Sequence, residues 1–206
     1  MITDVTGVLL AGGKSRRMGH DKRFLHIGES TLFGRSLAVL RSVFQNVLVV
    51  IAQDSPALQA EVPVVRDLVP DCGSLGGLYT GLRHAVTPYV FVVACDMPFL
   101  DPRVVQYVTG LKGNTDIVMA KQGDSMQPMH ALYSRRCLPV MEEMLKAHDL
   151  KIQKMVTHPS LQVRFITEAE LSGIDPDGRS FLNVNTPSDL EAARALHAAP
   201  TDPRSS

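Results

Sequence analysis

The residues best suited to chemistry gather in one stretch, GVLLAGGKSRRMGHDK, at positions 7–22. Gly12 and Gly13 directly follow an apolar run, and without a Cβ their backbone N–H groups can come close to a ligand. Amides in such a turn form an anion-binding concavity, and cations that include Arg17 and Lys22 surround it. Polyphosphate is the ligand type that needs both features, although a solvated basic loop would have the same composition.

Two common phosphate loops do not fit this stretch. A Walker A loop requires a glycine at position 8, where Val8 stands, although the GKS triplet itself is present at 13–15. The dinucleotide fingerprint G-x-G-x-x-G is also missing. The predicted phosphate site is therefore of another kind.

A carboxylate, Asp96, closes the most apolar run of the chain, in VVACDMPFL at 92–100. It is either the N-cap of the next helix or a magnesium ligand. Asp101, directly before Pro102, is the better cap candidate. Because Mg²⁺ takes one or two carboxylates together with substrate phosphates, Asp96 is the candidate metal ligand.

A glycine-rich stretch, RDLVPDCGSLGGLYTGL, lies at 66–82. Asp67 follows a short apolar run there, and small residues lead into a helix. Such a turn could let a nucleobase or ribose lie close to the backbone, or it could be a plain helix start with Ser74 as its cap.

A second polar stretch, FLNVNTPSDL at 181–190, has the composition of an ordinary helix start around Thr186 and Pro187. Asn183 and Asn185 precede that start. Their amides could also reach a second substrate or the metal, so both interpretations stay open.

Composition limits the classes of function. The chain has 206 residues, 45% of them hydrophobic and 20% charged, which is typical of one globular domain. Lys plus Arg and Asp plus Glu both number 21, so no global field favours nucleic acid or a membrane surface. Three separated cysteines without a CxxC pair, no signal peptide and no long apolar run predict a soluble cytoplasmic protein.

Short β-branched runs alternate with longer amphipathic ones, which predicts an α/β fold with a mainly parallel sheet. Ligands of such sheets bind beyond the carboxyl ends of the strands, here after Leu10, around Asp67 and after Cys95. We expect a single domain over 1–199 and a disordered tail over 200–206. The predicted strands are 6–10, 46–52, 62–65, 89–95, 116–120, 129–134 and 163–167, and the predicted helices 31–44, 74–86, 102–111, 137–148 and 187–199.

Four motifs, LLAGGKSRRMGHDK, DCGSLGGLYTGL, CDMPFL and NVNTPSDL, together resemble the molybdenum cofactor guanylyltransferases, the MobA-type nucleotidyltransferases. The resemblance implies a Rossmann-like three-layer α/β sandwich of the nucleotide-diphospho-sugar transferase type, which binds GTP and Mg²⁺. Such enzymes transfer GMP to the molybdopterin cofactor and release pyrophosphate. Cofactor-insertion or molybdenum-transfer proteins are the candidate partners.

The resemblance also implies roles for single residues. Lys22 would contact phosphates, Asp67 the nucleoside and Asp96 the metal, while Gln53 would contact the nucleoside where the family often has asparagine. Arg17 and Lys22 would stabilise developing charge, and Asn185 would contact substrate. The guanine and phosphate pocket would be lined by Leu10, Ala11, Gly12 and Gly13.

Three alternatives remain at this stage. Molybdopterin cytidylyltransferases typically have LAAG where this chain has LAGG, so Gly12 favours guanine. Sugar-1-phosphate nucleotidyltransferases share the opening loop but often carry a longer sugar-binding region. A regulatory module that binds GTP without catalysis is the third alternative. The loop also departs from some relatives, which have an additional residue before Asp21 and Lys22.

Overall fold

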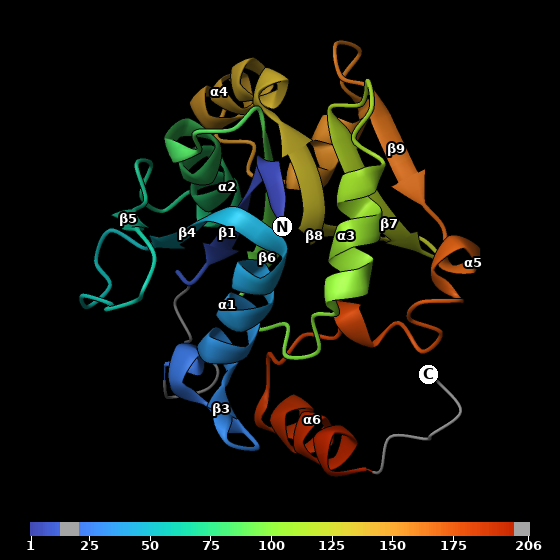
Figure 1. The fold of residues 1–206 in the computed structure, drawn as a ribbon. Helices are drawn as coiled ribbons and strands as arrows, with labels where there is room; N and C mark the ends of the chain where they lie inside the picture. Colours follow the sequence, from blue (N-terminus) through green and yellow to red (C-terminus); the bar gives the residue numbers. More distant parts are fainter. Residues whose placement is uncertain (13–20, 200–206) are drawn as a thin grey trace.

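The computed structural model describes residues 1–12 and 21–199, which form a seven-stranded sheet between two layers of helices (Figure 1). Gly13, Arg17 and the predicted tail 200–206 lie outside the described residues. The elements are β1 (Ile2–Leu10), η1 (Lys22–Phe24), β2 (His26–Ile27), β3 (Ser30–Thr31), α1 (Leu32–Val43), β4 (Phe44–Ile51), β5 (Val64–Arg66), α2 (Gly73–His84), β6 (Tyr89–Ala94), α3 (Pro102–Gly110), β7 (Ile117–Gln122), β8 (Ser125–Ser134), η2 (Arg135–Cys137), α4 (Leu138–Lys146), η3 (Ile152–Thr157), β9 (Val163–Ile166), α5 (Glu168–Leu171), η4 (Arg179–Phe181) and α6 (Pro187–Ala198).

The strand order of the main sheet is β5-β4-β1-β6-β8-β7-β9. Strand β8 runs antiparallel to β6 and β7, and the other neighbouring strands pair in parallel. A two-residue turn joins β7 to β8, and its first residue, Gly123, has a φ of 54° that favours glycine. The prediction of a mostly parallel α/β sheet is thus confirmed, with one inserted antiparallel strand.

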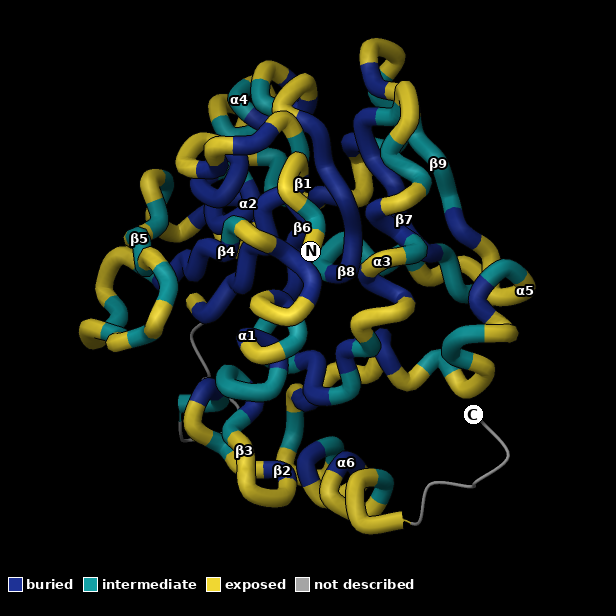
Figure 2. The backbone as a smooth tube through the Cα atoms, viewed as in Figure 1, coloured by how far each residue is buried: buried dark blue, intermediate teal, exposed yellow. Residues whose placement is uncertain are grey.

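Helices cover both faces of the sheet, as expected for strands that are apolar throughout. Helices α1, α3 and α5 pack on one face and α2 and α4 on the other, each layer with its own buried cluster. The strands form the buried centre of the molecule in Figure 2. None of the helices in the described part of the chain combines the length and apolarity needed to cross a membrane.

A third, smaller cluster joins the β2–β3 hairpin to α6, which lies below the main sheet in Figure 1. Its buried members are Ile27, Leu32, Val184, Leu190 and Ala193. Sequence analysis predicted α6 but missed the hairpin, whose two strands are two residues long each.

At the end of the sheet opposite to α6, Asp116 connects the three strands β7, β8 and β9. Its buried carboxylate accepts hydrogen bonds from the Ser134 hydroxyl (2.7 Å), the Arg136 guanidinium (2.6 Å) and the Gln162 backbone N–H (2.9 Å). Burial alone would raise the pKa of Asp116, but these three donors outweigh it and lower the pKa. The group is fully satisfied and serves the fold.

Candidate functional site

A cavity of about 780 Å³ opens at the carboxyl ends of β1, β4, β5 and β6. It lies where the strand-end rule for parallel sheets places ligands. The candidate residues that line it are Leu10, Ala11, Gly12, Lys22, Gln53, Asp67 and Asp96. The three strand ends selected from the sequence therefore meet in one cavity, whereas Gly13 and Arg17 lie outside the described residues.

Lys22 connects three distant segments of the chain. Its Nζ lies 3.7 Å from Oδ2 of Asp96 and donates a hydrogen bond of 2.9 Å to Oδ1 of Asn185. The backbone N–H of Val184 donates to the carbonyl of Asp96 (2.8 Å), which holds the segment before α6 against the end of β6. The chain thus brings the basic turn and the predicted metal ligand together.

Asp96 has the properties of a cation ligand. Its Oδ1 is buried and has no hydrogen-bond partner among the described residues. Burial raises the pKa of Asp96, and the nearby Lys22 ammonium acts in the opposite direction. No group of three or more acidic, histidine or cysteine side chains that could hold a metal occurs within residues 1–12 and 21–199. A magnesium ion would therefore be held by Asp96 together with substrate phosphates and water.

The predicted helix caps near the site have different outcomes. Asp101 is the N-cap of α3, and Thr186 is the N-cap of α6 with a capping box to Asp189, so both predictions are confirmed. Ser74 as the cap of α2 is wrong, because α2 begins at Gly73 after an N-cap residue without a side-chain hydrogen bond. Ser74 instead lies in the first turn of α2 and lines the cavity.

Asp67 is held by the helix that follows it. Its Oδ1 accepts from the Thr80 hydroxyl (2.8 Å) and from the Val69 N–H (3.0 Å). A Cβ at Gly76 would lie 3.0 Å from the other carboxylate oxygen, Oδ2. The glycines of α2 thus let the helix pack closely around Asp67, in addition to the ligand approach predicted for them.

Gly12 is required by packing as well. A Cβ there would lie 2.6 Å from the backbone nitrogen of Ala52, at the end of β4. No real structure tolerates that distance to a backbone atom without movement. Residue 12 is therefore coupled to the start of the loop that carries Gln53.

That loop is fastened by Arg66, the last residue of β5. The Nη1 of Arg66 donates to the carbonyls of Gln53 (2.7 Å) and Ser55 (2.9 Å). These bonds fix the backbone beside the cavity, where the neighbouring Asp54 also contributes a carboxylate.

Asn185 and Asn183 separate in the structure. Asn185 reaches Lys22, whereas Nδ2 of Asn183 donates to the backbone carbonyl of Phe181 at 3.1 Å and lines a smaller hollow beside α6. Of the two, Asn185 alone joins the hydrogen bonds around Lys22 that the structure describes.

Several residues of the cavity wall were not predicted from the sequence. Asp21 and Arg23 flank Lys22, and the Asp-x-Arg pattern that they share with Asp101 and Arg103 could have revealed them. Met129 lines the cavity and also packs against the cluster under α2 and α4. Other missed members of the wall are Asp54, Asp71 and Cys95.

Comparisons with known proteins agree with this geometry. The MobA-like NTP transferase domain matches residues 7–162. A probable molybdenum cofactor guanylyltransferase of Pelotomaculum thermopropionicum is 37% identical over 93% of this chain and 92% of its own length. A molybdenum cofactor guanylyltransferase of Desulfosudis oleivorans is also 37% identical, over 93% and 95% of the two chains.

Solved structures extend the comparison. Molybdopterin-guanine dinucleotide biosynthesis protein A from Archaeoglobus fulgidus superposes with a TM-score of 0.81 at 26% identity, over 93% of this chain and 97% of that one. The 2-C-methyl-D-erythritol 4-phosphate cytidylyltransferase of Thermus thermophilus shares the fold, with a TM-score of 0.66 at 17% identity, over 94% and 98% of the chains. Since the domain match spans most of the chain and the relatives nearly all of it, the chain belongs to the MobA-like NTP transferase family.

Proposed function

We propose that this chain transfers GMP from GTP to the terminal phosphate of the molybdopterin cofactor and releases pyrophosphate. The observation that carries the proposal is the meeting of Lys22 and Asp96, 3.7 Å apart, at the cavity where the strands end. The names of the 37% identical relatives support the choice of substrates.

The reaction needs charge neutralisation more than proton transfer. A phosphate oxygen of the cofactor attacks the α-phosphorus of GTP, a P–O bond forms, and the bond to the departing pyrophosphate breaks. The attacking phosphate is already ionised near neutral pH, so no general base is required. The task of the protein is to bring two anions together and to stabilise the charge on the leaving group.

The charge of the cavity wall supports a magnesium-bound nucleotide. The described lining holds five aspartates against one lysine and one arginine, a formal charge of −3. By themselves these described residues would repel a bare triphosphate. Asp96, with its unpaired Oδ1, would hold Mg²⁺, which would neutralise phosphate charge when bound. The sequence directly after Gly12 contains further basic residues, Arg17 among them.

Lys22 would stabilise the charge on the leaving group. It is the first residue of the short 3-10 helix η1, and its Nζ is oriented by the hydrogen bond to Asn185. Backbone amides at Gly12, and the first turn of α2 with Ser74, line the same cavity and can orient the nucleotide. Positioning together with preset positive charge is the main source of catalysis in phosphoryl and nucleotidyl transfer.

The direct test is pyrophosphate release from GTP, CTP, ATP and UTP, each with Mg²⁺ and with molybdopterin or glucose 1-phosphate. We expect release from GTP only when molybdopterin and Mg²⁺ are both present. Release from CTP instead of GTP would identify a cytidylyltransferase, and release with glucose 1-phosphate a sugar nucleotidyltransferase. GTP binding without any release would identify a regulatory module. Each of these three results would overturn the proposal.

Variants test the residue roles. Lys22→Ala and Asp96→Ala should each lower the rate of GMP transfer by about 10²–10³ at saturating GTP and Mg²⁺, the usual loss for one such contact. Lys112→Ala is the matched control, because it removes the 3.3 Å Lys112–Asp4 ion pair, neither member of which lines the cavity. Near-normal transfer by either site variant would refute the role assigned to that residue.

A further inference from the structure

Arg23 is an unusual member of the cavity wall because it is charged and yet only 5% exposed. Its Nε lies 2.9 Å from both carboxylate oxygens of Asp21, and its Nη2 lies 2.5 Å from Oδ2. The guanidinium also stands 5.5 Å from the ring centre of Phe24. Within the described part of the chain its Nη1 has no hydrogen-bond partner.

The bonds of Arg23 are local. A buried arginine usually joins distant elements, but every hydrogen bond that this guanidinium makes with a described side chain goes to Asp21, two residues earlier. Asp21 in turn accepts from the Arg23 backbone N–H (3.1 Å) and caps η1. The paired side chains therefore close a small ring around the one residue between them, Lys22.

This ring restricts the backbone conformation of Lys22. A lysine side chain is long and flexible, and holding it in one geometry costs about 2 kcal/mol of rotamer entropy. Here its Nζ forms an ion pair with Asp96 and a hydrogen bond with Asn185, two residues far from it in the sequence. A fixed backbone at position 22 limits the directions that the side chain can take.

We propose that Arg23 is a positioning residue that acts through Asp21 to hold the turn from which Lys22 reaches the metal ligand and the triphosphate. The planar fork of the guanidinium, which binds both carboxylate oxygens at once, is the feature that does this. The inference rests on the proposed function for its kinetic consequences, but not for its effect on Lys22 itself.

The first test needs no activity. Lys22 in nucleotide-free protein is acetylated with acetic anhydride, and the rate of its modification is followed by mass spectrometry. Arg23→Met should raise that rate several-fold, because Lys22 is no longer held toward Asp96. Asp21→Asn should act in the same direction, and it keeps the size and one oxygen of a side chain that is 37% exposed.

The second test is kinetic. Arg23→Met and Arg23→Lys should both lower kcat for GMP transfer by about 10- to 100-fold, as expected for a displaced catalytic group, with little change in the KM for GTP. Lysine keeps the charge at position 23 but cannot form the fork. In a Lys22→Ala background, Arg23→Met should have little further effect, because the two changes remove one function.

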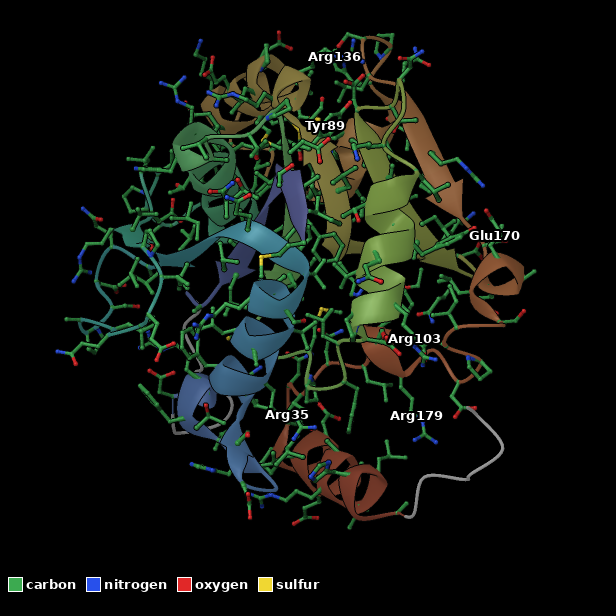
Figure 3. The ribbon with its side chains drawn as sticks, viewed as in Figure 1. Arg35, Tyr89, Arg103, Arg136, Glu170 and Arg179 are labelled. Carbon is green, nitrogen blue, oxygen red and sulfur yellow. The ribbon has the colours of Figure 1, made fainter. Side chains whose placement is uncertain are left out.

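The matched control is Arg103→Met. Arg103 forms the same fork with Asp101, also two residues earlier and also at a helix start, but neither residue lines the cavity. Figure 3 shows Arg103 at the lower end of α3. The control should leave the kcat and the reactivity of Lys22 unchanged.

Three results would overturn the proposal. The first is unchanged reactivity of Lys22 in Arg23→Met. The second is full activity of Arg23→Lys, which would assign the role to charge alone. The third is an undiminished effect of Arg23→Met in the Lys22→Ala background. An inactive wild-type enzyme would instead refute the proposed function and leave the acetylation result valid.

Discussion

His130 makes the stability of this protein sensitive to acid in a way that can be isolated by one substitution. The residue lies on β8 with no exposed surface, and neither ring nitrogen has a hydrogen-bond partner among the described residues. Its ring packs edge-on against Phe91 at 5.1 Å and against Phe181 at 4.6 Å between centroids. An imidazolium in this apolar position would lose its hydration without gaining a counter-ion.

The magnitude follows from the displaced titration. Burial lowers the pKa of His130 to about 4, from an ordinary value of 6.5. Between these values the unfolded chain binds a proton that the folded protein does not. Protonation of His130 in the unfolded chain therefore lowers the free energy of unfolding. This effect is absent above pH 6.5 and grows as the pH falls toward 4. At about 1.4 kcal/mol for each pH unit, the loss reaches about 3 kcal/mol.

The assay is urea unfolding from pH 7.5 to pH 4, followed by circular dichroism because the chain has no tryptophan. In His130→Leu the side chain has a similar size and no titration, so the unfolding free energy of the wild type should fall by about 3 kcal/mol more than that of the variant. His148→Asn, at an exposed position, should keep the wild-type slope. A constant difference between wild type and His130→Leu across this pH range would refute the reasoning.

Two further predictions concern the frame of the site, and a third concerns the opposite end of the sheet. Gly12→Ala should lower the unfolding free energy by about 1–3 kcal/mol, because the new methyl would lie 2.6 Å from the nitrogen of Ala52; urea unfolding measures the loss. Thr186→Ala removes the cap of α6 and should cost about 1 kcal/mol in the same measurement, with a lower kcat for GMP transfer because the displaced Asn185 no longer orients Lys22. Asp116→Ala leaves three donors unpaired and should cost about 3 kcal/mol at pH 7. Since the pKa of Asp116 is lowered, that difference should persist from neutral pH down to about 4 and shrink as the carboxylate of the wild type is protonated at lower pH.

The sequence predicted those elements whose burial leaves a hydrophobic pattern. Strands β1, β4 and β6 each end in a buried or half-buried apolar run, and their carboxyl ends could be placed at one edge. Strand β8 was predicted over 129–134 only, whereas it spans 125–134. Its first residues pair with β7 near the Gly123 turn and are not buried, so they carry no apolar signal. The antiparallel direction of β8 follows from that two-residue turn, which composition alone does not reveal.

The sequence predicted those residues of the site that follow the ends of strands. Lys22 and Asp96 follow different strands that end at the same edge, and their proximity is what the strand-end rule implies. Arg23 was missed because its role depends on a local turn that has no hydrophobic period. Asn183 is held away from Lys22 by a single hydrogen bond from its side-chain amide to the backbone carbonyl of Phe181, and no spacing rule encodes that bond.

The small cluster of β2, β3 and α6 belongs to the site even though it lies apart from the sheet. The turn with Lys22 leads directly into β2, and the loop with Asn185 leads directly into α6. The buried contact of Ile27 with the helix, and the hydrogen bond of 3.1 Å from Arg194 to the carbonyl of His26, hold these two segments together. The hydrogen bond between Lys22 and Asn185 is therefore a consequence of this packing. Loosening α6 should therefore disturb Lys22 even though no described residue of α6 lines the cavity and the helix lies beyond residues 7–162.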